Sequence, residues 1–217
     1  MEKIYYSFCP LKIILFFFLQ NLNAQQLENI ISTMEIFDIA TENRSLVFQY
    51  EDHFEAPNWT PDGSYLIYNS HGKLVEWDLE NEKLKMINSG DLVNLNNDHG
   101  ISPDGKYIVI SNNEPRLKAS DYLNGSSRIY ILPRIGGKPR LITNNAPSYW
   151  HSWSPDQKTL VFVAKRNADF NIYTVPFEGG EEVQITNDKG LDDGPDYSPD
   201  GKYIYYNSYA SGSMENI

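Results

Sequence analysis

Short stretches in which apolar and polar residues alternate run through most of this chain, separated by clusters of Pro, Asp, Asn, Gly and Ser. Alternation with a period of two predicts strands with one buried face, and the frequent Tyr, Ile and Val residues favour the same structure. Little of the sequence shows the 3.6-residue period of an amphipathic helix. We therefore predict an all-β protein, whose clearest strands cover residues 65–68, 107–110, 159–163 and 203–206.

A tetrapeptide of the form Ser/Thr-Pro-Asp-Gly comes shortly before each of these strands, at residues 60–63, 102–105, 154–157 and 198–201. Proline fixes φ at the second turn position, the hydroxyl before it can bond the local backbone, and glycine accepts the positive φ that ends the turn. Gln157 replaces the glycine in the third copy. We expect a left-handed or distorted backbone at that residue.

The tetrapeptides recur at intervals of 42, 52 and 44 residues, which is the repeat length of propeller blades. A third strand is predicted in each of the first three repeats, and a fourth follows a Gly-Gly pair in the second and third. The third strands cover residues 74–79, 128–132 and 171–175, and the fourth strands cover residues 139–143 and 182–186. We therefore predict a β-propeller of four-stranded antiparallel blades, one blade per repeat.

The longest interval carries its extra length between Asn112 and Ser127, in a segment rich in Pro, Asn, Gly and Ser. Such a composition is typical of a solvated surface loop, and the alternative is a partner-binding loop on the rim of the propeller.

The N-terminal residues 1–24 have the layout of a secretory signal peptide. Lys3 and Lys12 precede the apolar run 13–19, and Ala24 offers a small residue for cleavage before Gln25. The apolar run is too short for an ordinary membrane span, although an uncleaved anchor is the alternative. Residues 25–33 form a short segment before the first predicted strand.

The only cysteine of the chain, Cys9, lies inside this signal segment, so the exported chain contains no disulfide and no cysteine nucleophile. The chain has a net charge of −11, which becomes −12 when residues 1–24, with their net charge of +1, are removed. Such an acidic surface argues against binding nucleic acid. No apolar run after the signal segment is long enough to span a membrane.

The repeats resemble a known family. The sequence Ser-Pro-Asp-Gly-Lys-Tyr-Ile occurs at residues 102–108 and 198–204, and Gly-Gly pairs precede Ile-Thr at 142–143 and 185–186. This pattern is similar to the WD40-like repeats of TolB, the periplasmic propeller of the Tol-Pal envelope system, and most similar to related proteins that consist of a propeller alone. The resemblance covers residues 34–217. It implies a periplasmic protein that binds a protein or peptide, with no cofactor.

Members of that family have six blades, whereas about four fit here, so we expect an incomplete ring. Residues 34–39 and 45–48 read as the outer strands of a blade whose inner strands would come from the C-terminal end of a complete chain. The sequence stops where a third strand should begin. We therefore expect a truncated product whose open ends are sticky and whose stability is marginal.

Candidate site residues come from the inner strands, where propellers place their ligands. The position four residues before each turn proline holds Pro57, His99, His151 and Pro195. We expect His99 and His151 to occupy equivalent places and to face one axial funnel. The neighbouring candidates are Asp98, Trp150 and, in the corresponding loop of the last repeat, Asp192, Asp193 and Asp196.

These residues leave two interpretations open. His99 and His151 with nearby carboxylates suit a transition metal, as in pectin-degrading lyases with a related propeller and a histidine-rich channel. Alternatively, both histidines hydrogen-bond neighbouring turns. The Asn- and Asp-rich residues 94–98 and 187–188 lack the spacing of a calcium loop and read as turn formers.

An aromatic or aliphatic residue lies two positions before each turn proline, and we expect this column to form the core between blades: Trp59, Ile101, Trp153 and Tyr197. The chain has no G-x-S-x-G elbow and no phosphate-binding loop. Three functions follow as hypotheses: a protein-binding scaffold, a metal-dependent lyase-like or sugar-binding propeller, and an inert fragment.

Overall fold

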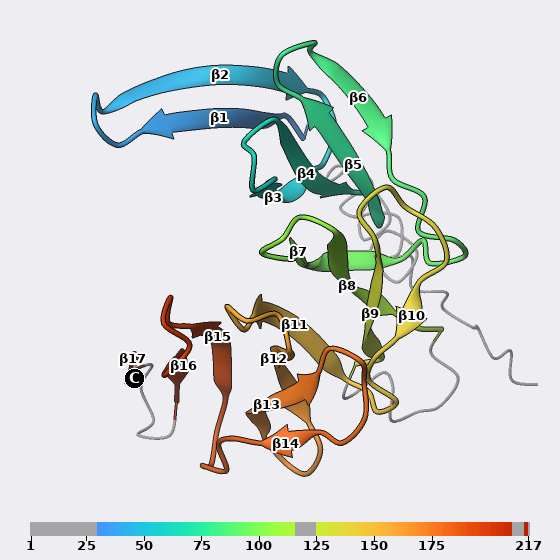
Figure 1. Ribbon diagram of the computed structural model, residues 1–217, viewed down its shortest axis with the longest axis vertical. Helices are drawn as coiled ribbons and strands as arrows, with labels where there is room; N and C mark the ends of the chain where they lie inside the picture. The colour runs from blue at the N-terminus through green and yellow to red at the C-terminus, as the bar shows by residue number, and fades with distance from the viewer. Residues whose placement is uncertain (1–29, 116–124, 210–214, 217) are drawn as a thin grey trace, which may run out of the picture. The chain divides into compact units, whose positions relative to one another are not determined.

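The computed structural model describes residues 30–115, 125–209 and 215–216 (Figure 1). The predicted signal peptide and the middle of the 112–127 loop lie outside these residues. Every regular element within them is a strand, and the strands form antiparallel sheets. The chain divides into two compact units at His53 and Phe54.

The described part of the first unit, residues 30–53, contains a single hairpin. Strands β1 (Ser32–Asp38) and β2 (Asn43–Tyr50) pair antiparallel, with a bulge between Met34 and Glu35. The carboxylate of Asp38 closes the turn by accepting hydrogen bonds from the backbone N–H groups of Ala40 and Thr41, at 2.8 and 3.0 Å. The hairpin corresponds to the predicted strand pair.

The second unit is a succession of four sheets. In each sheet, strands that follow one another in sequence are neighbours. The first sheet contains β3 (Glu55–Trp59), β4 (Tyr65–Ser70), β5 (Lys73–Asp78) and β6 (Lys83–Met86). The second contains β7 (Leu95–Ile101), β8 (Tyr107–Asn113), β9 (Ser127–Pro133) and β10 (Arg140–Leu141).

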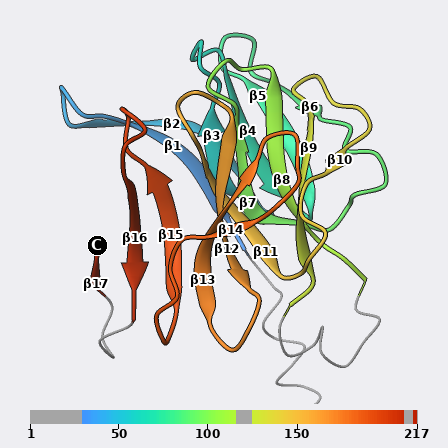
Figure 2. The ribbon, with the colours of Figure 1, turned by 60° about the horizontal axis from the view of Figure 1, so that its bottom comes forward.

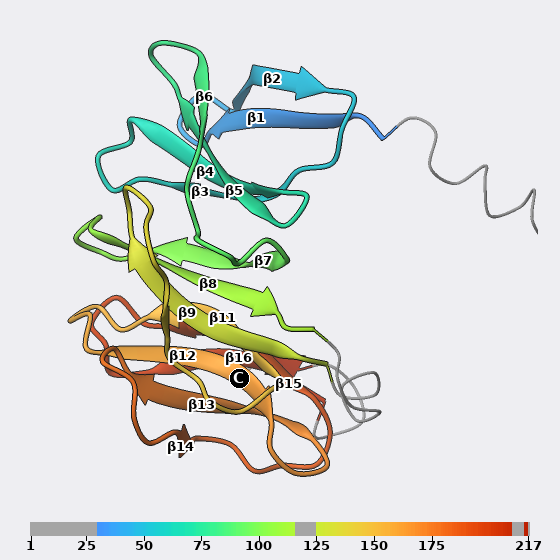
Figure 3. The ribbon, with the colours of Figure 1, turned by 90° about the vertical axis from the view of Figure 1, so that its right-hand side faces the viewer.

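The third sheet contains β11 (Ser148–Trp153), β12 (Thr159–Lys165), β13 (Phe170–Pro176) and β14 (Val183–Gln184). The fourth contains β15 (Asp192–Tyr197), β16 (Ile204–Ser208) and β17 (Glu215–Asn216). The inner strands β3, β7, β11 and β15 contact one another in that order, and Figures 2 and 3 show their sheets following one another. Each sheet is a propeller blade, as predicted.

The fourth strands are shorter than predicted, and the reason is local. The backbone N–H of Ile129 donates to the Thr143 hydroxyl (2.9 Å), and that of Ile172 donates to the Thr186 hydroxyl (3.0 Å). A side chain thus replaces the next backbone bond of the sheet, so β10 and β14 each end after two residues.

The repeated turns show why the tetrapeptide recurs. In the second copy, the Ser102 hydroxyl donates to the Asp104 carboxylate (2.7 Å) and accepts from the Tyr107 backbone N–H (3.0 Å). The hydroxyl bond lowers the pKa of Asp104. Gln157 has a φ of 62°, which confirms the left-handed geometry. Its side-chain oxygen also accepts from the Asp104 N–H of the preceding blade (3.3 Å).

Apolar side chains fill the spaces between neighbouring blades. Val109 and Ile129 of the second blade pack with Trp153 and Phe162 of the third. Trp153 is buried, and Ile101 and Tyr197 pack against core clusters, as the predicted column requires. Trp59 differs, since it is 50% exposed.

Candidate functional site

Each inner strand carries an irregularity in its pairing, and this irregularity decides which side chains are buried. In β11, Trp150 pairs with Phe162 and Ser152 pairs with Val161, so His151 is the extra residue of a bulge. A bulge leaves its extra residue outside the regular alternation of a strand. His151 is therefore free to face away from the core between the blades.

The bulge lies elsewhere in β7. Here Leu95 pairs with Asn112 and His99 with Ile110, so the three residues 96–98 lie opposite the single residue Ser111. His99 thus takes the place in the sheet that Trp150 takes in the next blade, although His99 and His151 align in sequence. The prediction that the two histidines are equivalent is wrong for this reason.

His99 and Trp150 are both buried, with exposures of 3% and 7%. A side chain at Gly100 would overlap the indole ring of Trp150, which therefore packs directly on the β7 backbone. Neither ring nitrogen of His99 has a hydrogen-bond partner among the described residues. Burial lowers the pKa of His99 to about 4, and nearby backbone groups of Ile67, Asn97 and Asn96 only partly oppose this shift. His99 is thus a neutral core residue.

Asp98 and His151 instead line a cavity of about 450 Å³, here called the inner cavity. Blades two, three and four contribute its walls, so it lies entirely within the second unit. Its lining residues are Asn96, Asn97, Asp98, Asn113, Tyr149, His151, Val163, Phe170, Leu191 and Asp193.

Two carboxylates and one imidazole give the inner cavity its charge. His151 Nε2 lies 3.3 Å from Asp193 Oδ1. This contact with His151 lowers the pKa of Asp193, and the Gly194 N–H, which donates to the same carboxylate at 2.8 Å, acts in the same direction. Burial raises the pKa of Asp98 to about 6, and the charge of His151 partly opposes that shift.

The remaining candidates lie on β15, in a strand and not in the predicted loop. Asp192 is buried and accepts a hydrogen bond from the Ser208 hydroxyl at 2.6 Å. Asp196 accepts one from the Ser152 hydroxyl of the preceding blade at 2.5 Å. Gly194, with a φ of 61°, and Pro195 form the irregular part of the strand between them. Of these three aspartates, only Asp193 lines the inner cavity.

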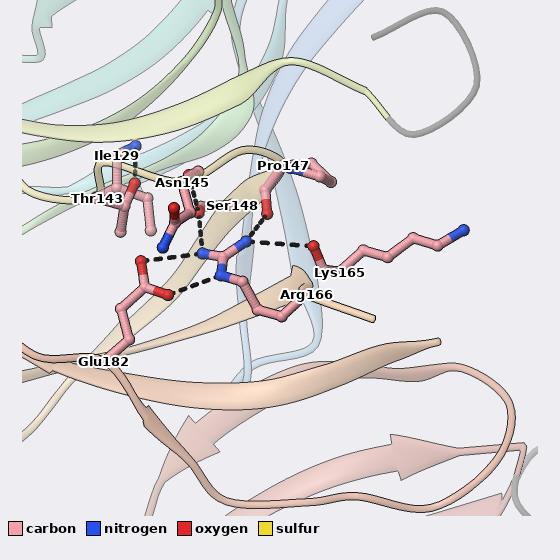
Figure 4. Close-up of polar contacts among 8 residues, drawn as sticks. All are labelled: Ile129, Thr143, Asn145, Pro147, Ser148, Lys165, Arg166 and Glu182. Carbon is pink, nitrogen blue, oxygen red and sulfur yellow. Dashed lines mark hydrogen bonds and ion pairs between the residues drawn. The ribbon is translucent and has the colours of Figure 1, made fainter. Parts of the chain in front are cut away.

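A partly buried ion pair fixes the strand that carries Tyr149 and His151 (Figure 4). Arg166, directly after β12, binds both carboxylate oxygens of Glu182 at 2.7 and 3.1 Å. The same guanidinium donates to the Pro147 carbonyl and to the Ser148 hydroxyl, both at 2.7 Å. The start of β11 is therefore tied to the end of β12 and to the segment before β14.

Sequence reasoning missed several lining residues, notably Tyr149, Phe170 and the three asparagines. Tyr149 and Phe170 read as ordinary strand aromatics, and their ring centres lie 6.4 Å apart. Asn96 and Asn97 belong to the Asn-rich stretch 94–98, which the sequence predicts to form turns. For Asn96, Asn97 and Tyr149, the signal that could have found them is their place near the N-terminal ends of the inner strands β7 and β11.

The described residues contain no group of three or more His, Cys, Asp or Glu side chains arranged to hold a metal ion. Within the same residues, no helix is long and apolar enough to cross a membrane.

Comparison with known proteins shows which proteins this chain is similar to. A family model described as the TolB β-propeller domain matches residues 109–215. The uncharacterized protein Atu1656 of Agrobacterium fabrum is 45% identical over 85% of this chain, which spans 60% of that relative. The Tol-Pal system protein TolB of Francisella tularensis is 25% identical over 81% of this chain, which spans 40% of that relative.

A solved structure described as a candidate TolB from Agrobacterium tumefaciens superposes with a TM-score of 0.77 and 44% identity. The match covers 85% of this chain and 64% of that chain. The chain thus spans less than two thirds of the length of these relatives. The repeats, the blade topology and these matches together show that the chain is a β-propeller similar to the TolB proteins.

Proposed function

We propose that this chain is an exported interaction scaffold, without catalytic activity, that binds a segment of a partner protein at the inner cavity. The observation that carries the proposal is the composition of that cavity. It combines two aromatic rings, three carboxamides and a carboxylate–imidazole–carboxylate set, carried by strands of three neighbouring blades. Concave sites with apolar walls and a few polar groups are typical of binding sites.

The family supports the same proposal. One relative is named as a component of the Tol-Pal system, and we propose a role of that kind, in the envelope, for this chain. Periplasmic export follows from the signal-peptide pattern of residues 1–24. The lyase-like alternative needs both His99 and His151 at one ligand, and the burial of His99 removes the reason to favour it.

Photo-crosslinking in the native host tests the scaffold proposal. A photoreactive phenylalanine analogue replaces Tyr149 in the cavity or, as a control, Leu84, which is 54% exposed on the outer strand β6. We expect a discrete protein adduct from position 149 and none from position 84. The Asp193→Asn variant should weaken the adduct. Identical adducts from both positions, or none from position 149, would contradict the proposal.

Export has its own test. The N-terminal sequence of the chain recovered from the periplasmic fraction should begin at Gln25, because Ala24 is the predicted cleavage site. A chain that retains Met1 and sediments with membranes would instead support the uncleaved anchor.

A further inference from the structure

We infer that the inner cavity recognises a protonated side chain, lysine or arginine, on the partner segment. This inference deepens the proposed function and depends on it. It rests on the chemistry of Asp98 and its surroundings.

Asp98 is the unusual group of the cavity. Its carboxylate accepts no hydrogen bond from residues 30–115 and 125–209, although the cavity walls remove much of its water. Asp193 differs, because it is already bonded to His151 and to the Gly194 N–H. A desolvated carboxylate without a donor is unfavourable, and a cationic donor is the partner that compensates it best.

The charges around Asp98 also favour a cationic ligand. The groups that act on it are His151 on β11, Asp193 on β15 and Glu55 on β3, two carboxylates against one imidazole. Among the described residues, no lysine or arginine lines the inner cavity. The net charge of the site is therefore negative whenever Asp98 is ionised, so a ligand with a positive charge is favoured over a neutral or anionic one.

The walls fit the rest of such a side chain. Tyr149 and Phe170 offer aromatic surface to a methylene chain, and an ammonium or guanidinium group is attracted to a ring face. The Phe170 ring already has a cation on one face, since Lys165 Nζ lies 5.6 Å from its centre. Asn97 and Asn113 carry amide oxygens that can accept the remaining N–H groups. A volume of about 450 Å³ is within the range of pockets that hold small ligands.

The test uses small probes with the full exported chain. Nα-acetyl-lysine N-methylamide, its arginine counterpart and the uncharged norleucine counterpart are titrated while NMR signals of aromatic residues are followed. We expect saturable shifts of Tyr149, His151 and Phe170 with the two cationic probes and none with norleucine. Asp98→Asn should weaken the lysine probe about tenfold, the usual effect of losing one charge-assisted hydrogen bond. Glu178→Gln, at a carboxylate that is 81% exposed and outside the cavity, is the matched control and should change nothing.

Two outcomes overturn the inference. One is equal binding of the norleucine probe to the unmodified chain, a result that does not depend on the folding of any variant. The other is tight binding of a free diamine such as putrescine without binding of the lysine amide, because the ligand would then be a small amine. Adduct formation from position 149 tests the scaffold separately, so a partner that crosslinks there while the cationic probes fail would refute this inference alone.

Discussion

His99 and Asp98 are adjacent in the chain, and burial favours the neutral form of each side chain. The neutral form is deprotonated for His99 and protonated for Asp98, so their contributions to stability depend on pH in opposite ways. His99 is held neutral in the fold, since its pKa is lowered from 6.5 to about 4. Its contribution to stability is present above pH 6.5 and is lost as the pH falls toward 4. Asp98 has a pKa raised from 3.8 to about 6, so its contribution is present below pH 3.8 and is lost as the pH rises through 6.

Single substitutions should separate the two effects. Relative to the unmodified chain, His99→Gln should gain stability as the pH falls from 6.5 to 4, by on the order of 3 kcal/mol at most. Asp98→Asn should show the opposite trend, losing stability relative to the unmodified chain between pH 6 and 4. Urea unfolding at several pH values measures, for each variant, how its free energy of unfolding differs from that of the unmodified chain. If the free energy of unfolding depended on pH in the same way in the His99 variant and in the unmodified chain, His99 would not be a buried neutral group.

At the scale of the element, contacts between strands fix the geometry of the site. The Arg166–Glu182 pair is largely shielded from water, with side-chain exposures of 15% and 13%. Removing one partner of such a pair leaves an uncompensated charge, which typically costs about 3–5 kcal/mol. Arg166→Leu should therefore destabilise the protein by about that amount and shift the NMR signals of Tyr149 and His151.

The control for Arg166 is a pair that is exposed to solvent. Lys158 and Asp156 lie 3.5 Å apart with exposures of 82% and 58%. Lys158→Ala should change stability by no more than about 0.5 kcal/mol. If the double variant Arg166→Leu, Glu182→Leu proved no more stable than Arg166→Leu alone, the uncompensated charge of Glu182 would not be the cause.

Gly100 tests the contact between β7 and β11. The backbone of Gly100 has an ordinary φ, so Gly100→Ala adds only the overlap with the Trp150 ring. Overpacking of this kind costs about 1–3 kcal/mol, and thermal unfolding should show the loss. In the double variant with Trp150→Leu, the same glycine substitution should cost little. An equal cost in both backgrounds would rule out the steric explanation.

At the scale of the whole molecule, repeats that contact only their neighbours should differ in local stability. The central strands β8 and β12 are buried on both faces, whereas all four residues of β6 are exposed. Native-state hydrogen exchange should therefore be at least about tenfold slower in β8 and β12 than in β6 and the β1–β2 hairpin. Uniform exchange across all strands would show that the blades unfold as one unit.

The feature of the sequence that predicts the fold best is the regular recurrence of the Ser/Thr-Pro-Asp turns. The Ser/Thr-Pro-Asp turns predict the blades because each turn is closed by its own residues, and Gln157 shows the left-handed backbone expected of it. The site was predicted only in part, because facing a cavity depends on pairing across strands. Aligning His99 with His151 by their distance from a proline cannot reveal that the bulges lie at different residues. Arg166 and Glu182 were missed for a similar reason, as they meet only after two strands have paired.

The bulges of the inner strands also bear on how such propellers diversify. An insertion or deletion of one residue can be absorbed by a bulge while the other strands of the blade keep their pairing. The bulge of β7 places Asp98 at the cavity and His99 in the core, whereas the bulge of β11 places His151 at the cavity and Trp150 in the core. Ligand preference among related propellers can thus evolve through small length changes in the innermost strand, and a comparison that scores substitutions alone would overlook them.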